Sequence, residues 1–78
     1  STEDVFANKF SVYPNPSSDV LNIRTNEPID KVELYNTIGQ LIVAKKTTNI
    51  NISSINIGVY ILKIYSGNRI VTKKVMIN

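Results

Sequence analysis

Hydrophobic and polar residues alternate over short segments along most of this 78-residue chain. Between residues 20 and 25, Leu21 and Ile23 fall on one face of an extended backbone, and Asn22 and Arg24 fall on the other. Alternation of this kind predicts half-buried β-strands. Similar segments, rich in β-branched and aromatic residues, recur at residues 9–13, 31–35, 50–52, 59–65 and 70–77. Residues 40–45 are nearly all apolar, and we expect them to form a central strand.

The segments between these strands contain turn residues. Gly39, Gly58 and Gly67 are the three glycines of the chain, and each lies at a break where a positive φ is wanted. No window of eleven or more residues follows a helical period, so we expect no helix longer than one turn. Seven short strands at a spacing of about ten residues predict an all-β fold, namely an antiparallel sandwich. A small closed barrel is the alternative.

The inward positions of these strands define a predicted core. Its members are Phe10, Val12, Leu21, Ile23, Val32, Leu34, Leu41, Tyr60, Leu62 and Ile64. Residues 1–8 are polar and acidic and follow no period, so we expect a linker or a frayed terminus, with the folded domain spanning residues 9–78. Because the chain does not start with methionine, we expect it to be a piece of a longer protein.

Two of the three prolines flank an asparagine in the stretch YPNPSSD, residues 13–19. Pro14 and Pro16 have no N–H donor and a fixed φ, so a strand ladder cannot continue through them. The side chains of Ser17, Ser18 and Asp19 can cap the bend. The stretch therefore predicts a stiff corner that ends the first strand and begins the second.

The side-chain inventory excludes most catalytic and metal chemistry. The chain has no cysteine and no histidine, so disulfides, zinc sites and nucleophilic triads cannot be built from their usual parts. The acidic residues are scattered, and Asp30 and Glu33 fall on opposite faces of a strand. We therefore expect no enzymatic activity and no cofactor. No apolar run approaches the length of a membrane span, so we expect no direct membrane insertion.

The charges divide between the two halves of the chain. Residues 1–39 have three basic and six acidic side chains, whereas residues 40–78 have six basic and no acidic ones. Either the two halves attract each other in the fold, or the second half presents a basic surface to a partner. Tyr60, Lys63, Tyr65, Lys73 and Lys74 form the mixture typical of a nucleic-acid stacking sheet. However, Tyr60 is on the face opposite Lys63 and fits the core, so we expect no nucleic acid partner.

Four sequence blocks follow one another in this order along the chain: FSVYPNPSSDVLNI, VELYNTIGQLI, INIGVYILKI and IVTKKVMIN. Together they resemble the type A C-terminal sorting domain of proteins exported by the type IX secretion system of Bacteroidota, and the resemblance covers residues 10–78. The residues that match the family motifs are Tyr13, Pro14, Asn15, Pro16, Tyr35, Asn36, Gly39, Gln40, Gly58, Tyr60 and Leu62. All of these residues also have a structural interpretation. The prolines can form a corner, the glycines can form turns, and Tyr60 can fill the core while its hydroxyl bonds a partner.

The resemblance implies a seven-stranded, immunoglobulin-like β-sandwich fused behind a secreted cargo. The cargo would enter the periplasm by a separate signal peptide, and the sorting domain would direct it to the outer-membrane translocon. The implied partners are this translocon, an outer-membrane shuttle and a sortase that removes the domain, leaving the cargo at the cell surface or outside the cell. Recognition would fall on the last segment, through Ile70, Val71, Lys73, Lys74, Val75, Met76, Ile77 and Asn78.

Lys73 and Lys74 should point to opposite faces of this segment. The alternative function is an immunoglobulin-like accessory module that binds glycan or spaces an enzyme from a surface.

Overall fold

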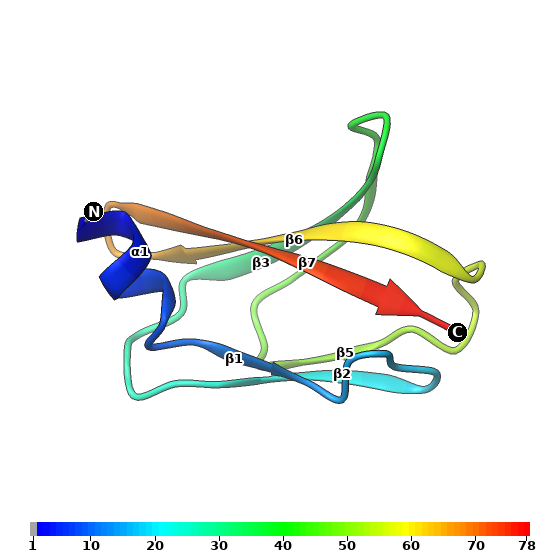
Figure 1. Ribbon diagram of the computed structural model, residues 1–78, viewed down its shortest axis with the longest axis horizontal. Coiled ribbons are helices and arrows are strands. Elements are labelled where there is room, and N and C mark those ends of the chain that lie inside the picture. The colour runs from blue at the N-terminus through cyan, green and yellow to red at the C-terminus, as the bar shows by residue number, and fades with distance from the viewer. Residues whose placement is uncertain (1) are drawn as a thin grey trace.

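Two antiparallel sheets pack face to face in the computed structural model, which describes the backbone of residues 2–78 and the side chains from residue 5 onward (Figure 1). The first sheet has the order β1-β2-β5, and the second has the order β4-β3-β6-β7. The strands are β1 (Ser11–Tyr13), β2 (Val20–Arg24), β3 (Lys31–Asn36), β4 (Leu41–Lys45), β5 (Asn49–Asn51), β6 (Gly58–Ser66) and β7 (Arg69–Ile77). All seven predicted strands are present, and the two separate sheets confirm the immunoglobulin-like sandwich over the barrel.

The core lies between the sheets and follows the predicted alternation. Eight of the ten predicted core residues are buried, and Val12 is half-buried against them. The sequence pattern left out five further core residues from β5, from the segment after it, and from β7. These are Ile50, Ile52, Val71, Val75 and Ile77, none of which is more than 3% exposed. Strand β7 therefore closes the core as well as ending the chain.

Strand β4 is not central, contrary to the prediction. It pairs with β3 alone, at the edge of the four-stranded sheet, and Leu41 is 52% exposed instead of lying in the core. The register shifts between Leu34 and Tyr35, where a β-bulge gives β4 one extra residue. Because a bulge bends its strand, Leu41 turns away from the core while Val43 still packs against it.

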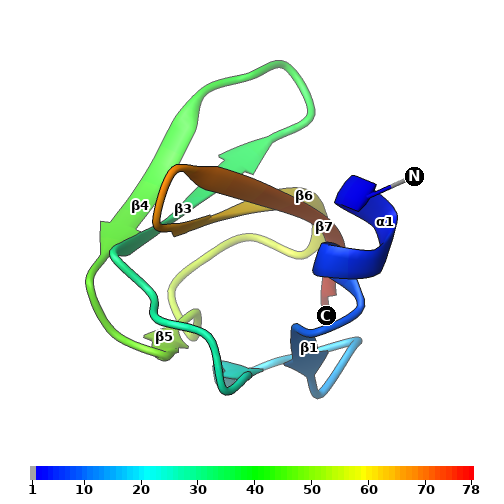
Figure 2. The same ribbon diagram turned by 90° about the vertical axis from the view of Figure 1, so that its left-hand side faces the viewer.

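A short helix, α1 (Thr2–Ala7), occupies the segment that the sequence predicts to be irregular. With six residues, it also exceeds the single turn we expected. Figure 2 shows α1 beside β7. The Phe6 ring packs edge-on against the Phe10 ring, with 5.2 Å between the ring centres. The Arg69 guanidinium lies 4.5 Å from the centre of the Phe6 ring. A helix this short depends on such tertiary contacts, which a periodicity test cannot detect.

Tyr60 tests the core most directly, because it is 8% exposed and its hydroxyl donates to the Asn56 carbonyl at 2.7 Å. We expect Tyr60→Ala to lower the free energy of unfolding by about 3 kcal/mol, because it opens a cavity. Tyr60→Phe keeps the ring and should lose only about 1 kcal/mol, the usual net contribution of one hydrogen bond. Equilibrium chemical denaturation measures both losses. A loss below about 0.5 kcal/mol for the alanine variant would contradict a core role.

Candidate functional site

The proline corner of residues 13–17 meets the free edge of the last strand. The Ser17 N–H donates to the Met76 carbonyl at 2.9 Å, and the Asn78 N–H donates to the Ser17 carbonyl at 2.8 Å. These two bonds make a parallel bridge between Ser17 and Ile77. The corner leaves the three-stranded sheet at β1 and returns to it at β2, so it links that sheet to the edge of the other one.

Asn15 extends the same contact with its side chain. Its Oδ1 accepts a hydrogen bond from the Met76 N–H at 2.9 Å, and its Nδ2 donates to the Lys74 carbonyl at 3.4 Å. A side-chain amide offers a donor and an acceptor, as a backbone peptide does. Asn15 therefore pairs with β7 much as a neighbouring strand would, and the corner serves as a short substitute strand.

Ser17 holds the corner together from inside. It is 1% exposed, and its hydroxyl donates to the Pro14 carbonyl. Both Tyr13–Pro14 and Asn15–Pro16 peptide bonds are cis. The sequence predicts the corner and its serine caps, but not its contact with β7, which is about 60 residues away along the chain. Two polar residues between and after prolines are the signal that could have pointed to such a partner.

The predicted recognition segment, residues 70–78, divides into an inward and an outward row. Val71, Val75 and Ile77 point into the core and are 3%, 0% and 3% exposed. Lys73 belongs to this inward row and is half-buried, whereas Lys74 is exposed on the outer face, as expected for adjacent strand residues. A partner of the folded domain can therefore reach Ile70, Lys74, Met76 and Asn78, all of which are exposed.

The second motif block builds the turn between β3 and β4. The Asn36 Oδ1 accepts from the Ile38 N–H at 3.1 Å and from the Gln40 N–H at 2.9 Å. The Asn36 Nδ2 also donates to the Gln40 Oε1 at 2.8 Å, and Gly39 takes a φ of +88° between them. Tyr35 lies at the end of β3, half-buried on its outer face. Asn36, Gly39 and Gln40 are thus fixed to one another in a single turn.

The third motif block places Tyr60 and Leu62 in the core. Leu62 is fully buried, and the Tyr60 hydroxyl finds its partner in the loop just before β6. Gly58 precedes them with a φ of +155°, and a Cβ added there would lie 3.7 Å from the Tyr60 ring. The three matched residues of this block therefore have structural roles.

Glu33 organises the outer face of the four-stranded sheet. The Tyr35 hydroxyl donates to its Oε1 at 2.9 Å, and the Lys31 Nζ lies 3.6 Å from its Oε2. Hydrogen bonds from Tyr65 and then Tyr35 lower the pKa of Glu33 below 4.5; desolvation opposes this shift, and the Lys31 charge adds to it. The hydrogen bond between Tyr65 and Glu33 raises the pKa of Tyr65 to about 12, and desolvation and the negative charge of Glu33 add to this shift.

The tyrosines of this domain are all engaged by its own residues. Cationic groups lie over three of the rings at 4.5–4.9 Å from their centres: Arg24 over Tyr13, Lys31 over Tyr65 and Lys63 over Tyr35. The fourth, Tyr60, is in the core. A stacking platform needs free ring faces, so this arrangement gives no support to a nucleic acid or glycan site.

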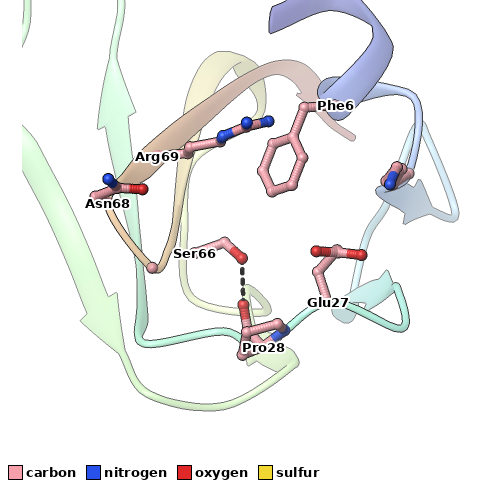
Figure 3. Close-up of a pocket in the computed structure, with 8 residues that line it drawn as sticks. Phe6, Glu27, Pro28, Ser66, Asn68 and Arg69 are labelled. Carbon is pink, nitrogen blue, oxygen red and sulfur yellow. Dashed lines mark hydrogen bonds between the residues drawn. The ribbon is translucent and has the colours of Figure 1, made fainter. Parts of the chain in front are cut away.

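A pocket of about 380 Å³ opens between α1, the loop before β3 and the β6–β7 turn (Figure 3). Arg69 and Phe6 lie on one side, Glu27 lies on the other, and the Ser66 hydroxyl donates to the Pro28 carbonyl. One carboxylate facing cations provides neither a nucleophile with a base nor a pair of acids. The pocket thus marks where α1 docks on the sandwich.

Among the side chains of residues 5–78, the structure shows no group of three arranged to hold a metal ion. The helix of this described part is also too short to cross a membrane.

The Glu33 cluster predicts two pH effects. The lowered pKa of Glu33 makes its contribution to stability present above about pH 4.5 and lost as the pH falls through the folded-state value. The raised pKa of Tyr65 makes its contribution present below pH 10.0 and lost as the pH rises towards about 12. Ultraviolet titration of tyrosine, compared with the Tyr65→Phe variant, should show a Tyr65 pKa of about 12 in the parent and a lower Tyr65 pKa in Glu33→Gln. Ionisation of Tyr65 near pH 10 in the parent would contradict this account.

The hydrogen bonds of Asn15 and Ser17 to residues 74–78 form a clamp on β7, and changes at Asn15 test this clamp. We expect Asn15→Ala to cost about 1 kcal/mol of unfolding free energy, because the Met76 N–H loses its acceptor at an exposed position. Asn15→Asp keeps that acceptor and loses only the longer bond to Lys74, so it should cost less. Thermal and chemical unfolding measure both variants. Equal stability of the alanine variant and the parent would contradict the clamp.

Comparison with known proteins identifies the family of the chain. No curated protein matches the chain. The family described as the secretion system C-terminal sorting domain matches residues 11–78, which include the proline corner, the Asn36 turn and the whole of β7. The chain belongs to this family of type IX secretion C-terminal sorting domains.

Proposed function

We propose that this domain carries a cargo fused in front of it through the periplasm to the type IX translocon, and that a cell-surface sortase then removes the domain. The family match supports a sorting signal for export to the cell surface or the extracellular space. The proposed partners are the translocon, an outer-membrane shuttle and the sortase.

The observation that carries the proposal is the meeting of the first and last motif blocks at the edge of β7. Asn15 and Ser17 hold the backbone of residues 74–78 in place. The clamp leaves Lys74 and Met76 exposed on the outer face, Met76 with 47% of its surface. A clamped strand with a fixed row of exposed side chains presents a partner with one defined surface at little entropic cost.

Charge supports the same surface. The six basic residues after residue 39 are all exposed or half-buried, and the same half of the chain has no acidic side chain. The Lys31–Glu33 ion pair joins two residues of the first half. Lys63 and Arg69 lie over the rings of Tyr35 and Phe6, whereas Lys74 is exposed on the outer face of β7, where it can attract an acidic partner over about one Debye length, roughly 8 Å.

We also propose that the domain has no catalytic activity of its own, because the sequence has no histidine and no cysteine. Turnover of a peptide, ester or glycoside by the purified domain, lost on a point change within it, would contradict this. The accessory-module alternative gains no support from the surface, where cations occupy the tyrosine rings.

A reporter with an N-terminal export signal, followed by residues 1–78, tests the function in a bacterium with a type IX system. We expect the reporter at the cell surface. Deleting residues 73–78 should leave it in the periplasm, but this deletion also removes Val75 and Ile77 from the core. Point variants are therefore needed to separate recognition from folding.

The lysines provide this separation. Lys74→Gln removes an exposed charge, Lys73→Gln removes the half-buried one, and both changes keep a long side chain. If the outer face is read by charge, Lys74→Gln folds normally and loses surface delivery by about tenfold, the effect of roughly 1.4 kcal/mol in binding. Delivery equal to the parent would contradict the charge mechanism. Surface delivery of the reporter without residues 73–78 would contradict the sorting function itself.

A further inference from the structure

Helix α1 is docked on the sandwich through one aromatic side chain. The Phe6 ring packs edge-on against Phe10, and the Arg69 guanidinium lies over the same Phe6 ring. Phe10 is 2% exposed and belongs to the core, and Arg69 is the first residue of β7. Phe6 and Ala7 are half-buried against the core, whereas Val5 is 64% exposed. Phe6 therefore joins α1 to both the core and the last strand.

The backbone between α1 and β1 is also closed by hydrogen bonds. The Lys9 N–H donates to the Phe6 carbonyl at 3.0 Å, and the Phe10 N–H donates to the Ala7 carbonyl at 3.1 Å. Residues 2–9 thus form a helix and a turn, with no extended stretch among them. A protease cleaves a folded segment only after local opening, and the rate follows the population of the open form when reclosing is fast. Docked α1 therefore protects these peptide bonds.

Opening of α1 does not require the sandwich to unfold. A helix of six residues is unstable by itself, so undocking Phe6 is enough to unwind it. Strand β1 begins at Ser11 and can keep its pairing with β2. The docking is also loosely packed, because a pocket of about 380 Å³ lies beside Phe6 and Arg69 and across from Glu27 (Figure 3). Side chains next to open space lack packing partners on that side, so undocking costs less than opening the core.

We propose that α1 controls the proteolytic removal of the domain. While docked, it shields the peptide bonds of residues 2–9, and once undocked, it exposes them to the sortase. This inference rests on the proposed function, in which a cargo precedes the domain and a sortase removes it.

The step that docking controls is the cleavage of one peptide C–N bond in this segment. The carbonyl carbon forms a new bond to the nucleophile, which is water or an amine. The nitrogen takes the proton that the nucleophile loses and becomes the new amino terminus of the domain. Docking sets how often this step can start and takes no part in its chemistry.

Two alanine variants of the same helix test the docking. Phe6→Ala removes the docked ring, whereas Val5→Ala changes an exposed side chain one residue earlier. The purified domain is digested briefly with a protease of broad specificity, and each cut is located by mass spectrometry. We expect Phe6→Ala to be cut within residues 2–9 about tenfold faster than the parent, which corresponds to roughly 1.4 kcal/mol of docking free energy. Val5→Ala should be cut no faster than the parent.

Two checks separate docking from other effects of these changes. Peptides of residues 1–10 with the same substitutions give the preference of the protease itself, and the rates are corrected for it. Chemical unfolding of each variant checks that the sandwich remains folded. Equal corrected rates for the two alanine variants would overturn the proposal.

The cation over Phe6 provides an independent test. Arg69→Gln removes this cation and keeps a long side chain, and Arg24→Gln removes the matching cation over Tyr13, in the other sheet. We expect Arg69→Gln to be cut about threefold faster within residues 2–9, the factor that one exposed cation–π contact supplies. Arg24→Gln should match the parent. An equal effect of the two changes would assign the effect to charge in general and overturn the role of docking.

The reporter fusion connects docking to removal in cells. We expect Phe6→Ala to reach the surface as the parent does, its domain to be removed faster, and the cut to lie within residues 2–9. A cut mapped ahead of residue 2, or removal at the parent's rate, would overturn the proposal and leave the sorting function standing. Failure of the parent to reach the surface would overturn the sorting function and this proposal with it.

Discussion

Four hydrogen bonds between residues 13–17 and the edge of β7 fasten the end of the chain to the rest of the sandwich. Strand β7 contributes Val71, Val75 and Ile77 to the core, yet its own sheet pairs it on one side only. A domain of 78 residues buries only about 60% of its unfolded surface and has a small margin of stability. An unclamped last strand would fray and expose both core side chains and a sheet edge open to other chains. The proline corner prevents this by taking the place of a neighbouring strand.

The clamp joins motif blocks from opposite ends of the sequence. The first block supplies the bonds that the last block needs, the Asn36 turn fixes the β3–β4 hairpin, and Tyr60 fills the core beneath β6. These motif residues are structural, and they position other residues that a partner can reach. Those residues are the outward row of β7, with Lys74 and Met76, and the tip of the hairpin, with Ile38. The framework thus holds these exposed side chains in fixed positions.

The alternating pattern was sufficient to predict the seven strands, the sandwich and most of the core, because inward and outward positions differ in hydrophobicity at every second residue. It was wrong for β4, since an apolar strand at an edge has the same composition as a central one, and the bulge that turns Leu41 outward leaves no signature in composition. It also missed α1, which exists through the contacts of Phe6 with Phe10 and Arg69. The corner itself was predictable from its prolines, but its partner was not, because local sequence carries no information about a contact with residues 74–78.

Amide hydrogen exchange in the unmodified domain tests the clamp most directly. The amides of Thr72 and Met76 point to the same free edge of β7, because residues an even number apart share their orientation. The Met76 N–H donates to Asn15, whereas Thr72 lies earlier on β7, outside the residues 74–78 that the corner contacts. The clamp predicts that the Met76 amide exchanges at least about a hundredfold more slowly than the Thr72 amide under native conditions. Equal and rapid exchange at both positions would show that the corner does not hold the last strand.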